Sequence, residues 1–253
     1  MPFVQTLLKS ALYRLGYSIK RLRPASAIAS GAGVQTDGSG IRGMLHAVDP
    51  YAGFDHTAWP PDLTGWGSES PAFRELIEAV RPRLIVEVGT WKGASAIHMA
   101  RLLATAGLDA QILCVDTWLG ALEFWTDQSD PARYRALALK HGWPQVYYQF
   151  LANVCHCGQQ PRITPFSQTS ATAALWLRNF GLKADLIYLD GSHEEEDVYG
   201  DLLAYWEALR AGGVIFGDDW SWDGVRCAVQ RFAREERLTV RFMADKWVLD
   251  KAR

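Results

Sequence analysis

Short apolar runs alternate with helix-forming segments from about residue 70 to the end of the chain. The runs are rich in β-branched residues and show no polar face, which is typical of strands in a buried parallel sheet. The predicted strands are residues 84–86, 111–116, 162–165, 185–190 and 214–217. The predicted helices are residues 71–80, 94–103, 130–141, 145–154 and 195–209. This alternation predicts an α/β fold with a mostly parallel, Rossmann-like sheet between two helical layers.

Residues 1–23 follow a different pattern. Apolar residues recur at helical spacing from Val4 to Leu22, and basic residues occupy much of the remaining surface. The pattern predicts an amphipathic basic helix as an N-terminal extension. Such a helix could pack on its own domain or on a second copy of the chain in a homo-oligomer. Alternatively, it could lie on an anionic membrane surface.

Residues 24–70 join this helix to the domain. The first part is rich in Ala, Ser and Gly, as expected of a linker. From His46 to Ser70 the segment is aromatic and rich in turns, and we expect it to cover the mouth of a pocket. Ser70 followed by Pro71 is typical of a helix start, so the main domain is predicted at residues 71–253. Gly212 and Gly213 predict the cap that ends the helix at 195–209.

Composition narrows the class of protein. The chain has 253 residues, of which 49% are hydrophobic and 21% charged, which suits one α/β domain with a large core. The net charge of −2 gives no indication of a nucleic-acid partner. The four cysteines suggest no disulfide framework, and Cys155-His156-Cys157 lacks the second pair that a zinc site needs. We therefore expect a cytoplasmic protein whose only membrane contact would be peripheral, through residues 1–23.

The first predicted strand ends in a glycine turn, Glu87-Val88-Gly89-Thr90-Trp91-Lys92-Gly93, and a helix follows. A strand, a glycine turn and a helix N-terminus form a nucleotide-sized pocket at the carboxyl edge of a sheet. The spacing is not that of the dinucleotide-binding GxGxxG pattern. It resembles motif I of the class I S-adenosylmethionine (SAM) methyltransferases, although a purely structural turn is the alternative.

Further polar residues follow the next strands. Asp116 ends the second strand, where a carboxylate binds ribose hydroxyls in nucleotide-binding α/β folds. By the same resemblance, the turn after the third strand lies beside adenine. The predicted cofactor contacts are Glu87, Gly89, Thr90, Gly93, Ser95, Asp116, Thr117, Trp118, Ser167, Gln168 and Asp190.

Three carboxylates end two neighbouring predicted strands. Asp190 follows the strand at 185–190, and Asp218 and Asp219 follow the strand at 214–217. Converging carboxylates repel one another unless a cation holds them, and oxygen ligands suit Mg²⁺, Ca²⁺ or Mn²⁺, of which we expect Mg²⁺. The sequence therefore predicts a divalent metal site at Asp190, Asp218 and Asp219. Alternatively, one acid is protonated or Asp219 caps the following helix.

Two stretches of the sequence resemble a known family: Asp190-Gly191-Ser192-His193, and GGVIFGDDW, which ends at Trp220. The resemblance is to the metal-dependent sugar O-methyltransferases of the macrocin and mycinamicin type and to the broader methyltransferase family 24. The resemblance covers roughly residues 84–219. It implies that His193 is the general base, that Asp190 belongs to the catalytic group, and that residues 238–242 and 246–249 form an antiparallel hairpin. Some relatives carry an acid where Ser192 stands. The alternative for His193 is a helix-start histidine bonded to backbone.

The chemistry and the tryptophans agree with this resemblance. A cation can acidify a sugar hydroxyl while a histidine takes its proton. Four tryptophans (Trp91, Trp118, Trp220 and Trp222) follow strand ends, where aromatic faces could stack on adenine or on a sugar. The sequence thus predicts SAM- and divalent-cation-dependent O-methylation of a sugar hydroxyl on a glycan, glycolipid or glycosylated metabolite. The alternatives are methylation of a catechol-like diol, or SAM or nucleotide binding without transfer.

Overall fold

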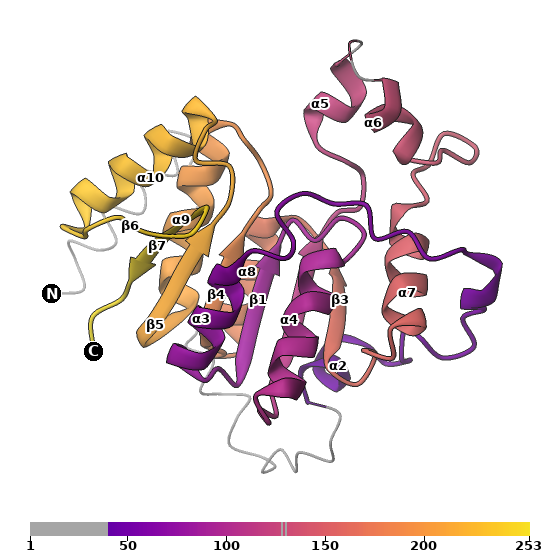
Figure 1. Ribbon diagram of the computed structural model, residues 1–253, viewed down its shortest axis with the longest axis horizontal. Coiled ribbons are helices and arrows are strands. Elements are labelled where there is room, and N and C mark those ends of the chain that lie inside the picture. Colours follow the sequence, from indigo (N-terminus) through magenta and orange to yellow (C-terminus); the bar gives the residue numbers. More distant parts are fainter. Residues whose placement is uncertain (1–39, 128, 130) are drawn as a thin grey trace, which may run out of the picture. The chain divides into compact units, whose positions relative to one another are not determined.

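The computed structural model describes residues 40–253, except residues 128 and 130 (Figure 1). The chain divides into two units, Met1–Gln35 and Thr36–Arg253, and all that follows concerns the second. The predicted helix over residues 1–23 and the predicted linker as far as residue 39 lie outside the described residues.

The described residues form a seven-stranded sheet in the order β3-β2-β1-β4-β5-β7-β6. The strands are β1 (Leu84–Val88), β2 (Gln111–Asp116), β3 (Ile163–Ser167), β4 (Ala184–Leu189), β5 (Leu209–Gly217), β6 (Arg241–Met243) and β7 (Lys246–Asp250). Strands β1 to β5 are parallel, whereas β7 and β6 are antiparallel additions at one edge. The predicted Rossmann-like sheet with a C-terminal hairpin is confirmed. The chain order reverses between β1 and β4, the place where open α/β sheets bind ligands.

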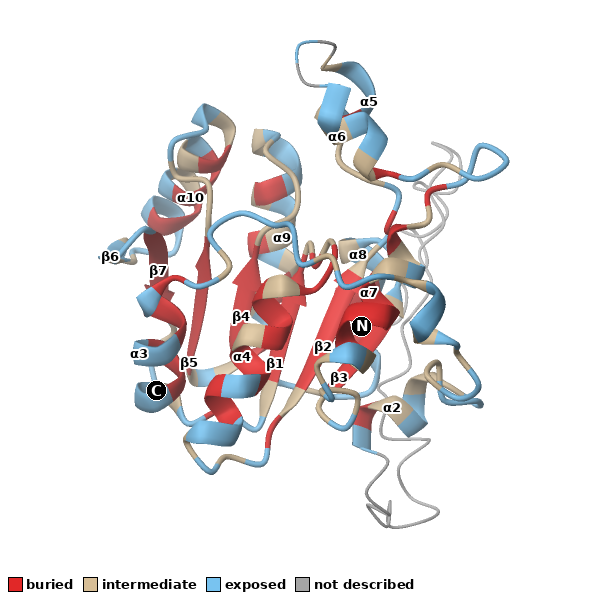
Figure 2. Cartoon of the chain, turned by 45° about the vertical axis from the view of Figure 1, so that its right-hand side comes forward, coloured by how far each residue is buried: buried red, intermediate tan, exposed pale blue. Residues whose placement is uncertain are grey.

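Helices flank the sheet on both faces (Figures 1 and 2). They are α2 (Gly40–Leu45), the 3₁₀ helix η2 (His56–Ala58), α3 (Pro71–Val80), α4 (Ala94–Thr105), α5 (Leu122–Thr126), α6 (Pro131–Ala136), α7 (Val146–His156), α8 (Ser170–Asn179), α9 (Glu195–Ala208) and α10 (Asp223–Glu235). The short helices α5 and α6 stand above the carboxyl ends of the strands (Figure 1). Among the described residues, no helix is long and apolar enough to cross a membrane.

Alternation along the strands divides the core into two layers. Ile85, Ile112 and Phe216 pack with α3, α4 and α7 on one face, whereas Val86 and Ile187 pack with α8, α9 and α10 on the other. These side chains are almost completely buried, so the sheet is covered on both sides (Figure 2). This burial explains why the strands read as continuous apolar runs in the sequence.

Several predicted boundaries differ from the structure. Gly212 and Gly213 were expected to cap α9, but α9 ends at Ala208 and both glycines lie inside β5. Leu209 is already extended (φ −81°, ψ 135°) and pairs with Ala184, and a bulge then shifts the register. The helix predicted over residues 130–141 is also shorter, since α6 ends at Ala136. By contrast, Ser70 caps α3 as predicted, accepting a hydrogen bond from the amide of Ala72 (3.3 Å).

Candidate functional site

The glycine turn after β1 lies directly against the loop after β4. Gly89 has φ +84°, and a Cβ atom there would lie 1.9 Å from the carbonyl oxygen of Asp190. Glycine was expected here because a ligand approaches the backbone. The structure gives a nearer reason, since the backbone of Asp190 already fills the space. Gly93 (φ +85°) ends the turn against the ring of Phe150 and is the N-cap of α4.

The carboxylate of Asp116 holds the glycine turn from β2. Its Oδ2 accepts hydrogen bonds from the amides of Thr90 (2.9 Å) and Trp91 (2.8 Å). Its Oδ1 accepts one from the amide of Trp118 (2.7 Å). Burial raises the pKa of Asp116, while these backbone hydrogen bonds oppose the rise. Asp116 therefore lies at the predicted ribose position and also fixes the turn that a nucleotide would contact.

Glu87 lies beneath the turn, completely buried. Its carboxyl group contacts the hydroxyl of Ser95. The hydroxyl of Thr90 lies 3.4 Å from the same group, and the thiol of Cys114 lies 3.6 Å from it. Burial raises the pKa of Glu87 to about 8, so the group is largely protonated at neutral pH. The polar groups of Glu87, Ser95 and Thr90 thus face one another and support the turn from below.

The other predicted cofactor residues divide into buried and exposed positions. Trp118 is only 2% exposed and packs against Tyr147 and Phe150, so it belongs to the core and does not offer a free face. Its indole nitrogen donates to the carbonyl of Trp91 (2.8 Å). Thr117, Ser167 and Gln168 are exposed, and Ser167 lies opposite Asp116 in the β2–β3 register. The structure therefore places the predicted ribose and adenine residues side by side.

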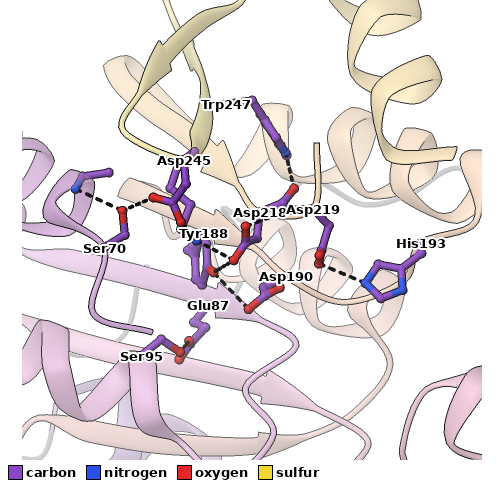
Figure 3. Close-up of polar contacts among 12 residues, drawn as sticks. Ser70, Glu87, Ser95, Tyr188, Asp190, His193, Asp218, Asp219, Asp245 and Trp247 are labelled. Carbon is purple, nitrogen blue, oxygen red and sulfur yellow. Dashed lines mark hydrogen bonds and ion pairs between the residues drawn. The ribbon is translucent and has the colours of Figure 1, made fainter. Parts of the chain in front are cut away.

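A second group of polar residues, which we call the acidic edge, consists of Asp190, Asp218 and Asp219 at the ends of β4 and β5 (Figure 3). The hydroxyl of Tyr188 lies 3.0 Å from Asp190 Oδ2 and 3.5 Å from Asp218 Oδ2. Burial, followed by the charges of Asp218 and Asp219, raises the pKa of Asp190 well above its usual range. The predicted convergence of carboxylates at this edge produces strong mutual repulsion.

Basic side chains face two of these carboxylates. The ammonium group of Lys246, at the start of β7, lies 2.5 Å from Asp218 Oδ2. The Nε2 atom of His193 lies 2.9 Å from Asp219 Oδ2. Sequence reasoning identified His193 but missed Lys246. Only the register of the C-terminal hairpin places Lys246 beside β5, and no local motif marks it.

His193 is held from three sides. Besides Asp219, Glu123 Oε1 on α5 lies 3.1 Å from Nδ1, an ion-pair contact without hydrogen-bond geometry. The ring also stacks on Trp222, with centroids 4.2 Å apart and planes at 15°. The hydrogen bond to Asp219 raises the pKa of His193, burial opposes this rise, and the charges of Asp219 and Glu123 add to it. His193 thus binds a side chain and not the backbone, and Asp219 does not cap α10, whose N-cap is Trp222.

The acidic edge fits a divalent cation in donor chemistry but not in the expected three-carboxylate arrangement. Its ligands would be carboxylate oxygens, as hard cations prefer, and a cation would offset the repulsion that raises the pKa of Asp190. Among the described side chains, however, no three acidic, histidine or cysteine groups lie closely enough together to hold an ion. The physical reason is that Asp218 turns to Lys246 and Asp219 to His193.

Aromatic side chains surround this edge. Trp91 packs edge-on against Phe124 of α5, with centroids 4.7 Å apart. Its indole nitrogen is buried and has no hydrogen-bond partner among the described residues. Trp222 is 42% exposed, and Trp220 packs on Phe242. Of the four predicted tryptophans, Trp118 is therefore buried, Trp91 and Trp220 are partly buried, and Trp222 is exposed.

Comparison with known proteins assigns the chain to a family. A family model described as a methyltransferase domain (methyltransferase family 24) matches residues 86–220, more than half of the chain. The chain belongs to this family. The match spans both the glycine turn and the acidic edge, which are the two regions that the family resemblance depended on.

Individual relatives are distant. An uncharacterised protein, y4gI of Sinorhizobium fredii (strain NBRC 101917 / NGR234), is 26% identical over 156 residues, which is 62% of this chain. The match spans only 15% of that relative's own length. Among solved structures, the O-methyltransferase TomG from Streptomyces achromogenes, in complex with SAM, has a TM-score of 0.52 and 15% identity, with 95% of this chain and 94% of that one covered. An O-methyltransferase from Bacillus cereus in complex with SAH has a TM-score of 0.51 and 14% identity, with 98% of this chain and 97% of that one covered. These likenesses establish the shared fold.

Proposed function

We propose that this protein is a SAM-dependent O-methyltransferase that acts on a sugar hydroxyl. The observation that carries the proposal is the contact between the glycine turn and the acidic edge at Gly89 and Asp190. A methyl donor in the turn would therefore lie next to His193 and the carboxylates. Family membership supports methyl transfer, and the SAM and SAH complexes of structurally similar O-methyltransferases support the donor.

The turn provides the donor side. When bound, SAM supplies an activated methyl group on a sulfonium centre. Asp116 and the exposed residues Thr117, Ser167 and Gln168 would bind the nucleoside, while Glu87 and Ser95 keep the turn in shape from below. The indole nitrogen of Trp91, which is buried and has no partner in the described part of the chain, would be a further hydrogen-bond donor at this position. These groups bind and orient, which is what an in-line transfer requires.

The acidic edge provides the acceptor side. His193 would take the proton of the acceptor hydroxyl as the oxygen–carbon bond forms and the carbon–sulfur bond breaks, and SAH would leave. Because carboxylates lie beside both ring nitrogens, the contact with Glu123 or Asp219 must open before the base form is available. Glu123 belongs to the short helix α5 above the edge, which makes it the simpler contact to open.

We further propose that the reaction uses a divalent cation, with Mg²⁺ the best fit to carboxylate oxygens. Of the three predicted ligands Asp190, Asp218 and Asp219, Asp218 is paired with Lys246, so Asp190 and Asp219 are the residues that would hold it. When bound, the cation would acidify the hydroxyl. Asp219→Ala should lose activity and ion dependence while keeping most of the SAM affinity. Full activity of the wild-type protein after exhaustive chelation would remove the ion from the mechanism.

A sugar acceptor is favoured by the aromatic rim. Trp222 presents an exposed indole beside His193, and an indole face binds the apolar C–H face of a sugar ring. The same face would also accept a catechol-like diol, so this remains the second candidate. Residues 1–23 could bring the protein to an anionic membrane or join two copies of it. Deleting them should abolish liposome binding in the first case and change the oligomer mass in the second.

The proposal is tested in two steps. Calorimetry with SAM, SAH and NAD, each with and without Mg²⁺, should give binding of SAM and SAH alone. Transfer of a labelled methyl group from SAM to a panel of glycosides and catechols should then label glycosides, and His193→Ala should suppress the labelling. Preferential labelling of catechols would favour the second candidate. SAM binding with no transfer to any acceptor would indicate a binding protein.

A further inference from the structure

Lys246 is a buried cation inside the acidic edge. Its side chain is 0% exposed, and its ammonium group lies 2.5 Å from Asp218 Oδ2 and 2.9 Å from Asp245 Oδ2. The rings of Phe73 and Tyr188 lie 5.9 and 6.0 Å from the same nitrogen. Burying an ammonium ion is costly unless anions and π faces surround it, so this arrangement is a built cation site occupied by a side chain.

The segment before α3 closes this site. A Cβ atom at Gly67 would lie 2.4 Å from Asp218 Oδ2 and 2.7 Å from the nitrogen of Lys246. The hydroxyl of Ser70, the N-cap of α3, binds Asp245. The backbone near residue 67 therefore covers the ion pair directly. Glycine is required there by this close approach and by its positive φ of +58°.

The three carboxylates of the acidic edge are therefore not equivalent. Asp218 is paired with Lys246 through its side chain. The backbone carbonyl of Asp218 accepts a hydrogen bond from the indole of Trp247 (2.8 Å). Asp219 is paired with His193. Asp190 has the hydroxyl of Tyr188 as its side-chain partner within the described part of the chain. Figure 3 shows Asp190 and Asp219 on the His193 side of Asp218.

We propose that Lys246 is the resident cation of the acidic edge: it pairs permanently with Asp218, so that an incoming divalent ion is held through Asp190 and Asp219. This inference deepens the cation part of the proposed function and rests on it. A fixed ammonium repels a second cation close by, and it also removes one anion from the ligand set. Lys246 thus sets the affinity of the edge for a divalent ion and acts as a positioning residue for Asp218.

The test measures Mn²⁺ binding, by the electron paramagnetic resonance signal of free Mn²⁺, and melting temperature with and without the ion. Lys246→Met keeps the length of the side chain and removes its charge. The variant should bind Mn²⁺ at least about tenfold more tightly than wild type, since the repulsion is lost and Asp218 is freed. Mn²⁺ should also raise its melting temperature more than that of wild type. A lysine with only a packing role would not change ion affinity in this direction.

Lys251→Met is the matched control. The ammonium group of Lys251 binds the backbone carbonyls of Trp206 and Leu209, and its removal should leave Mn²⁺ affinity unchanged. A second measurement does not depend on the folding of Lys246→Met. In the wild-type background, Asp218→Asn should weaken Mn²⁺ binding much less than Asp190→Asn or Asp219→Asn.

The outcomes separate the two proposals. If folded Lys246→Met binds Mn²⁺ no more tightly than wild type, the assignment of Lys246 is overturned. The assignment is also overturned if Asp218→Asn loses as much Mn²⁺ affinity as Asp190→Asn. Mn²⁺ binding by Lys246→Met but not by wild type supports the resident cation. That result would at the same time overturn the use of a divalent ion by the natural protein.

Discussion

The carboxylates at the carboxyl edge of the sheet are satisfied in two different ways. At the ends of β1 and β2, Asp116 accepts hydrogen bonds from three backbone amides, and Glu87 is buried among hydroxyls and largely protonated. At the ends of β4 and β5, Asp218 and Asp219 face the side chains of Lys246 and His193. Asp116 is thus held by backbone amides, whereas Asp218 and Asp219 face side chains that are distant in the sequence.

This difference suggests a division of labour. Backbone amides neither titrate nor change rotamer, so the half around Asp116 is a rigid cradle, suited to a donor that binds in the same way each time. Side-chain pairs can open and exchange partners, so the half around His193 suits proton transfer. Substitutions in the cradle should therefore affect stability and SAM affinity, whereas substitutions at the acidic edge should affect turnover.

The largest effect is expected at His193. His193→Ala should slow turnover by about 10²- to 10⁴-fold, the usual contribution of a positioned base. SAM affinity should hardly change, because the cradle lies on other strands. Since Asp219 raises the pKa of His193, the wild-type rate should increase with pH in a limb centred above pH 6.5, and the variant should lose this limb. Rate–pH profiles and calorimetry measure both.

His141→Ala, at an exposed histidine between α6 and α7, is the control and should keep both the rate and the pH limb. If His193→Ala retained the rate and profile of wild type, the base would lie elsewhere, with Asp190 as the next candidate.

Gly89→Ala should destabilise the fold by about 3 kcal/mol, because its Cβ would collide with the carbonyl of Asp190 at a positive φ. Urea unfolding gives this value. Gly107→Ala is a useful comparison, since Gly107 also has a positive φ (+63°) but open space around its Cβ position. Gly107→Ala should lower the free energy of unfolding by about 1 kcal/mol. Equal losses in the two variants would mean that the contact between the turn and the acidic edge adds nothing.

Glu87→Gln should change how stability depends on pH. The pKa of Glu87 is about 8 in the folded state, whereas its ordinary value is 4.5. The protonated side chain therefore contributes fully to the free energy of unfolding below pH 4.5, and this contribution is lost as the pH rises toward 8. The variant cannot ionise at this position. Its stability relative to wild type should therefore increase between pH 5.5 and 7.5, by on the order of 2 kcal/mol. Urea unfolding at the two pH values checks this, and a constant difference would show that Glu87 ionises normally.

The smallest effect is expected where the segment at residues 46–70 meets the glycine turn. Lys92 is 6% exposed in its side chain, and its ammonium group lies 2.6 Å from Asp62 Oδ2. Because Asp62 is partly exposed, Lys92→Met should cost only about 1 kcal/mol and weaken SAM binding by less than tenfold. Lys183→Met, at an exposed lysine, controls for loss of charge. A larger loss of SAM affinity in Lys92→Met would make the segment part of the cradle.

The parallel strands and the residues at their carboxyl ends could be anticipated from local patterns. Apolar runs determined β1 to β5, and the acids at their ends determined which residues share the carboxyl edge, because parallel strands bring these ends together. The boundary of α9 could not be predicted in this way. Gly212 and Gly213 have the local features of a helix cap, yet pairing with β4 draws them into β5. Strand pairing is a non-local interaction, and it overrides a weak local preference.

By itself, the sequence determined which carboxylates meet, since that follows from strands and their ends. Only the tertiary structure decided which cation each carboxylate faces. Lys246 reaches Asp218 because β7 runs antiparallel to β5, and Glu123 reaches His193 because α5 stands above the edge. Ion pairs depend on distances of a few ångströms between residues far apart in the chain, and no periodicity or spacing in the sequence encodes such distances.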